Sequence, residues 1–174
     1  MHLHCATFTT PCGPFSVAVN GEGVVFATAF GECTALTARI ATECHLIGDT
    51  RALTSAVQQE VADYFAGQRR VFTVLMAAQG SRFQRQVWAG LGAIPFGETR
   101  SYGQLAGELG KAGAARAVGR ANATNPLALL VPCHRVISAD GALGGFAFGS
   151  TIKRHLLTHE SAAPSLVDAD VLLS

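Results

Sequence analysis

Apolar and β-branched residues gather in short runs through the first third of the chain, a pattern typical of strands. Residues 14–19 (PFSVAV) and 23–28 (GVVFAT) are two such runs. They are joined through Asn20-Gly21, a dipeptide that favours tight hairpins because both residues tolerate a positive φ. We therefore expect an antiparallel hairpin here. Two further runs predict additional strands, the first of them at an edge of the sheet: residues 4–9 and 70–76.

Between these runs the apolar positions change to a helical spacing. They fall three or four residues apart, at Leu53, Val57, Val61 and Tyr64. Gly67 follows at the place where such a helix would end. The first half is therefore predicted to be a small sheet with one helix packed on it, and it shows no group of residues typical of a catalytic site.

The pattern becomes mainly helical from Gly80-Ser81 onward. One apolar stripe is formed by Phe83, Val87, Leu91 and Ile94. Ser81 is a suitable N-cap for this helix, and Pro95 and Gly97 would end it.

Two shorter helices are predicted over residues 102–109 and 114–123, with Gly110 and Gly113 in the turn between them. Helix, glycine-containing turn and helix are the layout of a helix-turn-helix. The second of these helices (AARAVGRANA) has small side chains and two arginines, so its backbone could approach DNA closely. The same small residues could instead pack the helix tightly against a neighbour, and the pattern leaves both interpretations open.

Composition shows that the chain can fold, and the succession of predicted elements indicates its fold class and domains. Of the 174 residues 49% are hydrophobic and 14% charged, with a mean hydropathy of +0.29, so the chain can bury a core and is not disordered for most of its length. We expect an α+β protein with a sheet-and-helix domain over residues 1–79, a helix-turn-helix domain over 80–160 and a loosely attached tail over 161–174. No apolar run is long enough to span a membrane, and the first ten residues (MHLHCATFTT) do not have the pattern of a signal peptide. We expect a cytoplasmic protein, or a nuclear one if the source is eukaryotic.

The charges are distributed unevenly along the chain. The net charge is +1 overall, but it is −2 over residues 1–80, +6 over 81–155 and −3 over 156–174. A basic segment in a near-neutral chain fits a face that binds nucleic acid or phosphate. It also fits an ordinary solvated surface, so charge alone does not decide the partner.

The cysteines point to a reducing compartment. Their number is odd and their spacing irregular, which is not typical of a disulfide framework: Cys5, Cys12, Cys33, Cys44 and Cys133. His2, His4, Cys5 and Cys12 match no standard zinc spacing, so we expect no structural zinc and no other metal.

The candidate reactive centre is residues 131–136 (VPCHRV). Cys133 is followed by His134 and Arg135, and positive charge near a thiol favours the thiolate, which is the nucleophilic form. Adjacent side chains in a strand point to opposite faces, so this tripeptide alone is weak evidence for catalysis and favours a structural cysteine.

These residues carry a resemblance that extends from residue 83 to residue 160, nearly half of the chain. The sequence over this range resembles the O6-alkylguanine-DNA alkyltransferases, also called methylated-DNA–protein-cysteine methyltransferases. The segment VPCHRV is similar to the active-site signature of that family. Further segments match in order and spacing: FQRQVW at 83–88, FGE at 96–98, SY at 101–102, RAVG at 116–119, NP at 125–126 and KRHLLTHE at 153–160.

The resemblance implies a reaction and roles for the residues that carry it out. Cys133 would accept an alkyl group from O6 of guanine, with O4 of thymine as a second donor, in an irreversible single turnover. His134 would act as its base through a water, and Glu160 would orient and charge-balance the histidine. Asn125 would hold the cysteine loop against the helix-turn-helix.

The same resemblance implies how DNA would be bound. The alkylated base would have to leave the stack, and Arg116 would fill the gap while Tyr102 pushed the phosphate and helped to protonate the departing guanine. Ala117 would lie among the small residues that face the minor groove. The carbonyls near Cys133 and Val136 would read the edge of the base, and Arg135 would be a further DNA or substrate contact.

Two residues of the loop after the cysteine depart from the family pattern. Phe146 stands where a tyrosine is common, which keeps an aromatic wall and loses a hydroxyl. Phe148 stands where glycine is usual. Both differences affect the range of alkyl groups that would fit, and both residues would line the substrate pocket.

The expected function is therefore DNA repair by a self-consuming alkyltransferase. It would act on double-stranded DNA as a monomer, with no cofactor and no membrane. Two alternatives remain at this point. One is a non-catalytic helix-turn-helix protein that binds damaged DNA or regulates transcription, which the presence of Cys133 disfavours. The other is a cysteine hydrolase using Cys133 and His134, for which the sequence shows no oxyanion site.

Overall fold

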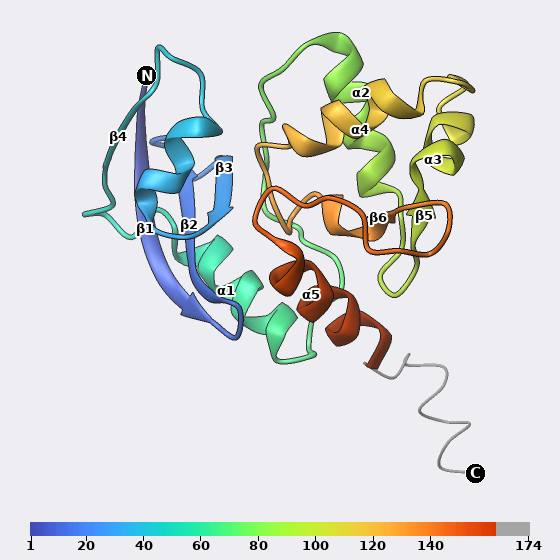
Figure 1. The fold of residues 1–174 in the computed structure, drawn as a ribbon. Helices are drawn as coiled ribbons and strands as arrows, with labels where there is room; N and C mark the ends of the chain where they lie inside the picture. Colours follow the sequence, from blue (N-terminus) through green and yellow to red (C-terminus); the bar gives the residue numbers. More distant parts are fainter. Residues whose placement is uncertain (163–174) are drawn as a thin grey trace.

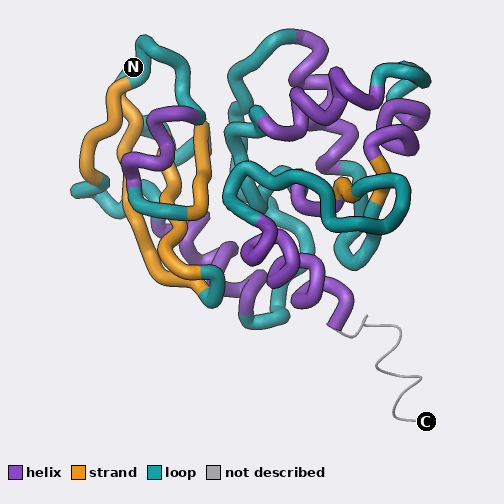
Figure 2. Tube along the Cα trace, in the orientation of Figure 1, coloured by secondary structure: helices purple, strands orange, loops and turns teal. Residues whose placement is uncertain are grey.

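The structure is a computed structural model, and it describes residues 1–162 (Figure 1). The strands of the larger sheet gather on one side of the molecule, and most of the helices lie on the other, together with the short strands β5 and β6 (Figure 2). The elements are, in chain order, β1 His2–Thr10, β2 Gly13–Val19, β3 Val25–Phe30, the 3-10 helix η1 Cys33–Ala38, β4 His45–Gly48, α1 Ser55–Phe65, α2 Arg82–Gly92, β5 Arg100–Ser101, α3 Tyr102–Glu108, α4 Ala115–Ala123, η2 Cys133–Arg135, β6 Val136–Ile137 and α5 Ser150–Ala162. The expected α+β class is confirmed. α5 includes the first two residues of the expected tail over 161–174, and the remainder of that tail lies outside the described residues.

The larger sheet has the strand order β3-β2-β1-β4. The predicted hairpin between β2 and β3 is present, and its turn is held by Asn20, whose Oδ1 accepts hydrogen bonds from the backbone amides of Glu22 and Val24. The strand predicted over residues 4–9 is present within β1, but it is not at the edge along its whole length, because β4 pairs in parallel with the outer side of residues 2–5. β4 has only four residues, most of them exposed, so the pattern of apolar residues did not predict it.

The predicted strand over residues 70–76 is wrong. This segment touches the sheet through a single bridge between Met76 and Val25. The backbone amides of Thr73 and Val74 donate to the carboxylate of Glu60 on α1 and not to a neighbouring strand. A side chain thus satisfies the backbone groups that a strand partner would otherwise pair.

The predicted helices of the second half are confirmed to within about two residues at each end. Ser81 and Ser101 each cap a helix, and each forms a reciprocal capping box with the glutamine three residues later. The turn between α3 and α4 places Gly110 and Gly113 at φ values of 70° and 87°, where a β-carbon would be strained. α2, α3 and α4 share one apolar core, which also includes Cys133.

A second core lies between the sheet and the helical side. Residues 127–130 and Leu156 pack with the inner faces of β2, β3 and α1. β3 also grips the segment that leads to Cys133, because Thr28 donates its amide to the carbonyl of Pro126 and its hydroxyl to the carbonyl of Ala128. The next residue, Leu129, has a φ of 72°, which is strained for a side chain of this kind. The sheet therefore holds the approach to the cysteine in a conformation that this segment would not adopt by itself.

We expect Thr28→Val to lower the free energy of unfolding by about 1–2 kcal/mol, because the buried carbonyl of Ala128 loses its donor while the side-chain volume is kept. Urea denaturation measures this loss. Thr37→Val is the matched control, since its hydroxyl donates to a carbonyl at an exposed position, and we expect an effect within about 0.5 kcal/mol. Equal losses for the two variants would contradict a role for Thr28 in holding the segment.

Candidate active site

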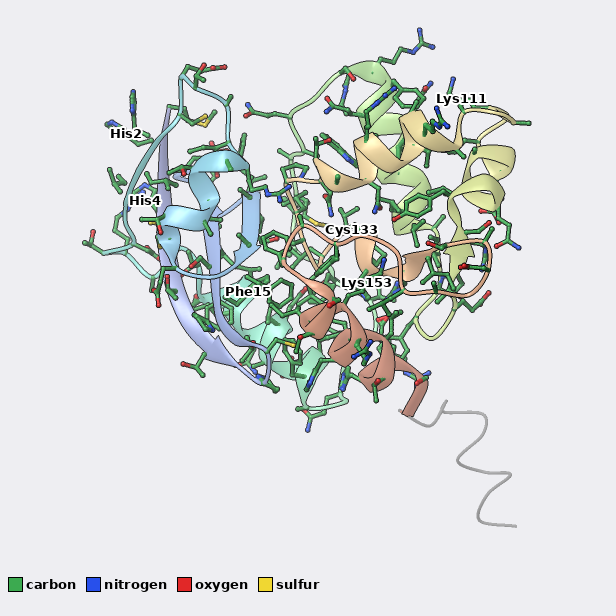
Figure 3. The ribbon with its side chains drawn as sticks, in the orientation of Figure 1. His2, His4, Phe15, Lys111, Cys133 and Lys153 are labelled. Atoms are coloured by element: carbon green, nitrogen blue, oxygen red, sulfur yellow. The ribbon has the colours of Figure 1, made fainter. Side chains whose placement is uncertain are left out.

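Cys133 lies where the two sides of the molecule meet (Figure 3). It begins η2, directly after Pro132, and its side chain reaches the wall of a cavity of about 270 Å³. The cavity is enclosed by η1, α3, α4 and the loop before α5. Its lining residues are Arg39, Tyr102, Gly119, Asn122, Ala123, Asn125, Cys133, Gly145, Phe146, Ala147 and Phe148.

The thiol of Cys133 is held in its neutral form. Burial raises its pKa, and this outweighs the opposing effects of a hydrogen bond with Asn125 and of the positive charges of Arg39 and Lys153. Only 4% of the residue is exposed. A neutral thiol is a weak nucleophile, so the site needs a base that can take its proton.

His134 has the environment of such a base. Its Nε2 lies 2.8 Å from Oε2 and 3.1 Å from Oε1 of Glu160. A carboxylate only accepts hydrogen bonds, so Nε2 carries the proton and Nδ1 keeps its lone pair. Nδ1 is buried and has no hydrogen-bond partner within residues 1–162. Burial lowers the pKa of His134 despite the opposing effect of Glu160, so the imidazole is neutral near neutral pH.

Glu160 is the buried carboxylate at the centre of this network. Burial alone would raise its pKa, but hydrogen bonds and charge from His134 and Arg135 outweigh burial and hold the pKa at about 2. Arg135 contributes Nε at 2.6 Å from Oε1, and Tyr64 donates its hydroxyl to Oε2 at 3.2 Å. The carboxylate therefore stays ionised and its position is fixed from three sides.

The structure places Arg135 away from any surface that DNA could reach, contrary to its expected place among the DNA contacts. Its guanidinium is buried between Glu160 and the carbonyl of Ile94, to which Nη1 donates at 2.7 Å. Leaving this position would strand the charge of Glu160 in the interior. Arg135 is thus the counter-ion of Glu160.

Asn125 and Lys153 fix the backbone around the thiol. Asn125 donates its side-chain amide to the carbonyl of Val131 and accepts from the amide of Leu127. Lys153 is fully buried and donates to the carbonyls of Val136 and Gly145 at 2.6 and 3.0 Å, with a pKa lowered by burial to about 8. The carbonyl of Val136, an expected contact of the base, therefore already accepts one hydrogen bond and keeps its second lone pair.

The expected DNA-contacting residues lie along α3 and α4. Arg116 is exposed near the start of α4, and Ala117 is half-buried beside it. Tyr102 is half-buried at the start of α3, and its ring lies against Gly119 of α4 and lines the cavity. Burial raises the pKa of Tyr102, so its hydroxyl is protonated at neutral pH.

The two departures in the loop before α5 both line the cavity. The ring of Phe148 packs edge-on against Phe30 and Phe146, with centroids 5.6 Å apart in each case. Phe30 belongs to β3, so this loop is packed against the sheet. Phe148 therefore fills the side of the cavity where a glycine would leave space.

Two residues of the first half reach the site, where the sequence showed no candidates. Tyr64 comes from α1. Arg39 ends η1, donates to the carbonyls of Ala123 and Asn125 at the end of α4, and lies 4.9 Å from the ring centroid of Phe148. The positive charge thus sits at the negative end of a helix and near the thiol. Neither residue has a local sequence signal, because each acts on a segment at least 84 residues away.

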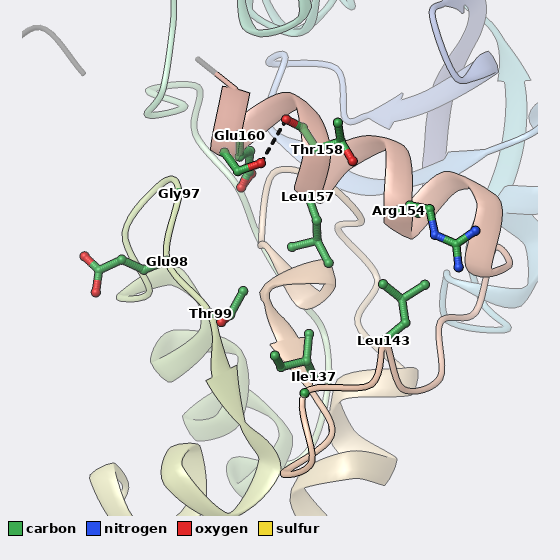
Figure 4. A pocket seen from close by; sticks show the side chains of 11 residues that line it. Gly97, Glu98, Thr99, Ile137, Leu143, Arg154, Leu157, Thr158 and Glu160 are labelled. Atoms are coloured by element: carbon green, nitrogen blue, oxygen red, sulfur yellow. Dashed lines mark hydrogen bonds between the residues drawn. The ribbon is translucent and has the colours of Figure 1, made fainter. Parts of the chain in front are cut away.

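A larger hollow of about 320 Å³ lies beside α5, and none of its lining residues is a cysteine. The side chains of Ile137, Leu143 and Leu157 line it (Figure 4). Glu160 also borders it, whereas Cys133, His134 and Arg135 do not. Within residues 1–162 no three His, Cys, Asp or Glu side chains are grouped so that they could hold a metal ion. Over the same residues no helix has both the length and the apolar character needed to cross a bilayer.

The low pKa of Glu160 predicts a pH dependence of stability. The pKa falls from its usual 4.5 to about 2 on folding, so the group stabilises the fold above pH 4.5 and loses this contribution as the pH falls toward 2. We expect the gap in unfolding free energy between the wild type and Glu160→Gln to shrink by about 2 kcal/mol between pH 7 and pH 3. Urea denaturation at several pH values measures it, and a constant gap would contradict the assignment.

Comparison with known proteins agrees with this arrangement. Residues 82–162 match the family model described as 6-O-methylguanine DNA methyltransferase, DNA binding domain. The methylated-DNA–protein-cysteine methyltransferase of Mycobacterium tuberculosis is 44% identical over 94% of this chain and 96% of its own length, and that of Methanosarcina acetivorans is 39% identical over 92% and 99%. The crystal structure of the M. tuberculosis O6-methylguanine methyltransferase has a TM-score of 0.83 at 38% identity, covering 98% of this chain and 99% of that one. M. tuberculosis OGT in complex with DNA has a TM-score of 0.79 at 37% identity, covering 99% of both chains. Similarity of this extent shows that the chain belongs to the methylated-DNA–protein-cysteine methyltransferase family.

Proposed function

We propose that Cys133 is the residue that accepts the alkyl group, and that the group comes from O6 of an alkylated guanine in double-stranded DNA. The protein is a DNA repair alkyltransferase that transfers the group to its own cysteine. The observation that supports Cys133 is its place: it is the cysteine that lines the cavity beside an imidazole whose proton is fixed by a buried carboxylate. A protein that only bound DNA would have no use for this arrangement.

The reaction is a displacement at the alkyl carbon. His134 Nδ1 takes the thiol proton through one bridging water, the sulfur forms a bond to the carbon, and the bond from that carbon to O6 breaks. The electron pair of the broken bond stays on guanine, which gains a proton from the hydroxyl of Tyr102. The phenolate left on Tyr102 and the imidazolium of His134 then return to their neutral forms by exchanging a proton through solvent. Glu160 stabilises the positive charge that develops on His134, and Arg135 keeps Glu160 ionised.

The base has to leave the helix to reach Cys133. Inside a duplex O6 is packed among stacked base pairs, and flipping the nucleotide costs a few kcal/mol, less for a poorly paired base. Arg116 fills the vacated space, since a guanidinium can stack and form hydrogen bonds at once. Ala117 and its small neighbours on α4 let the backbone approach the minor groove, and the basic charge of residues 81–155 binds phosphates.

The acceptor is part of the protein, so the reaction needs no cofactor, and each molecule reacts once because a thioether is stable. One chain supplies every group used here, so we propose that the protein acts as a monomer. A reduced thiol at Cys133 fits the cytoplasm as its compartment.

Incubation with an oligonucleotide duplex containing O6-methylguanine tests the acceptor. We expect one methyl group per protein, located at Cys133 by mass spectrometry of peptides, with no further turnover. Cys133→Ser should bind the duplex and gain no methyl group. Repeated turnover would contradict the proposal, as would labelling at any of the other cysteines: Cys5, Cys12, Cys33 or Cys44.

The role of Arg116 is tested by comparing duplex DNA with free O6-methylguanine base. We expect Arg116→Ala to slow transfer from the duplex at saturating DNA by about tenfold, and transfer from the free base by less than about twofold, because only the duplex requires flipping. Arg120→Ala is the matched control, since Arg120 is exposed on the same helix one turn later. It should weaken binding in a salt-dependent way and leave the saturated rate unchanged. Equal losses on both substrates for Arg116→Ala would contradict a role in flipping.

A further inference from the structure

Tyr64 connects the first half of the chain to the pair formed by His134 and Glu160. It lies on α1, is fully buried, and its hydroxyl donates to Oε2 of Glu160 at 3.2 Å. The same oxygen lies 2.8 Å from Nε2 of His134. Tyrosine and imidazole therefore share one carboxylate oxygen, and each hydrogen bond reduces the negative charge that the other can use.

Packing fixes the hydroxyl of Tyr64 in place. Its ring contacts Phe65, Phe72 and Phe96, with centroids 5.0 to 6.1 Å away, and the ring of His159 at 4.9 Å. These rings leave the tyrosine no room to turn away from the carboxylate. Burial and the nearby charge of Glu160 raise the pKa of Tyr64 far above neutral pH, so its hydroxyl remains a donor throughout the working range.

We propose that Tyr64 is a positioning residue for the alkyl-transfer reaction, which sets the proton affinity of His134 by drawing charge from Glu160. This inference rests on the proposed function, because it requires His134 to be the base for Cys133. The hydroxyl keeps the imidazole neutral at moderately acidic pH, where a stronger pull from Glu160 would have it protonated and unable to accept the thiol proton.

The direction of the effect follows from the neighbours of the pair. Arg135 holds the charge of Glu160 from η2, and the pKa of about 2 keeps Glu160 ionised between pH 4.5 and 8. Removing the hydroxyl of Tyr64 leaves more of the carboxylate's charge to His134, which raises the pH at which the imidazole becomes protonated. The substitution changes none of the other titratable or charged groups around Tyr64, Glu160 and His134. These groups are Cys12, Arg39, Tyr102, Cys133, Lys153 and His159.

Tyr64→Phe keeps the ring and removes only the donor. The experiment follows a single turnover of methyl transfer from an O6-methylguanine duplex between pH 4.5 and 8, with protein in excess. The transfer rate should fall at low pH as His134 becomes protonated, and we call this fall the acidic limb. In Tyr64→Phe we expect its midpoint to move up by about 0.5 pH unit. At pH values well below the midpoint, the rate relative to the plateau of the same variant then falls about threefold. The titration of the His134 ring, followed by NMR, should move by the same amount.

Phe72→Leu is the matched control. It removes a ring that packs on Tyr64 and leaves every hydrogen bond of Glu160 in place. This variant should lose stability without a change in either midpoint. A Tyr64→Phe protein that loses stability and keeps the wild-type midpoints would show that the tyrosine is only structural, and would overturn the inference.

The wild type separates this outcome from a failure of the proposed function. Labelling at a cysteine other than Cys133, or a transfer rate with no acidic limb, would remove His134 as the base and would overturn both proposals. Labelling at Cys133 with an acidic limb supports the proposed function, and the two midpoints of Tyr64→Phe then decide the role of the tyrosine.

Discussion

A carboxylate with almost no access to water is the constraint on which this protein depends. Glu160 is 3% exposed, and an ionised group in such a place is tolerated only if charge and hydrogen bonds compensate it. The compensation comes from an arginine and an imidazole on η2 and a phenol on α1, while the carboxylate itself lies on α5. Three segments that are distant in sequence are thereby fixed around one pair of oxygen atoms. The segment that carries Cys133 has a defined position because the next two residues, His134 and Arg135, are bound to Glu160.

The electrostatics of the site favour a resting state with little reactivity. Burial keeps Cys133 as a thiol and His134 as a neutral imidazole. An ion pair of thiolate and imidazolium, by contrast, would react with many electrophiles. In the reaction that we propose, the proton needs to move only when an alkylated base occupies the cavity and excludes water from it. For a protein that reacts once, such restraint prevents its loss to electrophiles that are not in DNA.

Local chemistry made much of the fold predictable. The serine caps of α2 and α3, the glycines of the turn between α3 and α4, and the asparagine of the β2–β3 hairpin all act within a few residues of themselves. The motif around Cys133 likewise singled out the cysteine that lines the cavity and the histidine that contacts Glu160. What the sequence did not reveal acts over long distances. The amides of Thr73 and Val74 pair with Glu60, so an apolar run is not a strand. Arg135 faces inward because Glu160 is there, and Arg39 and Tyr64 acquire their places only when the two halves pack together.

The hydrogen bonds from Thr28 to Ala128 and from Tyr64 to Glu160 span 100 and 96 residues. Contacts between such distant residues form late in folding, because closing long loops costs entropy before the contacts can repay it. During synthesis the larger sheet and α1 leave the ribosome before α5, which supplies Glu160. Until α5 docks, His134 has no carboxylate to orient it and Cys133 is not enclosed. A chain that still lacks α5 therefore contains Cys133 and His134 without the carboxylate on which the proposed reaction depends.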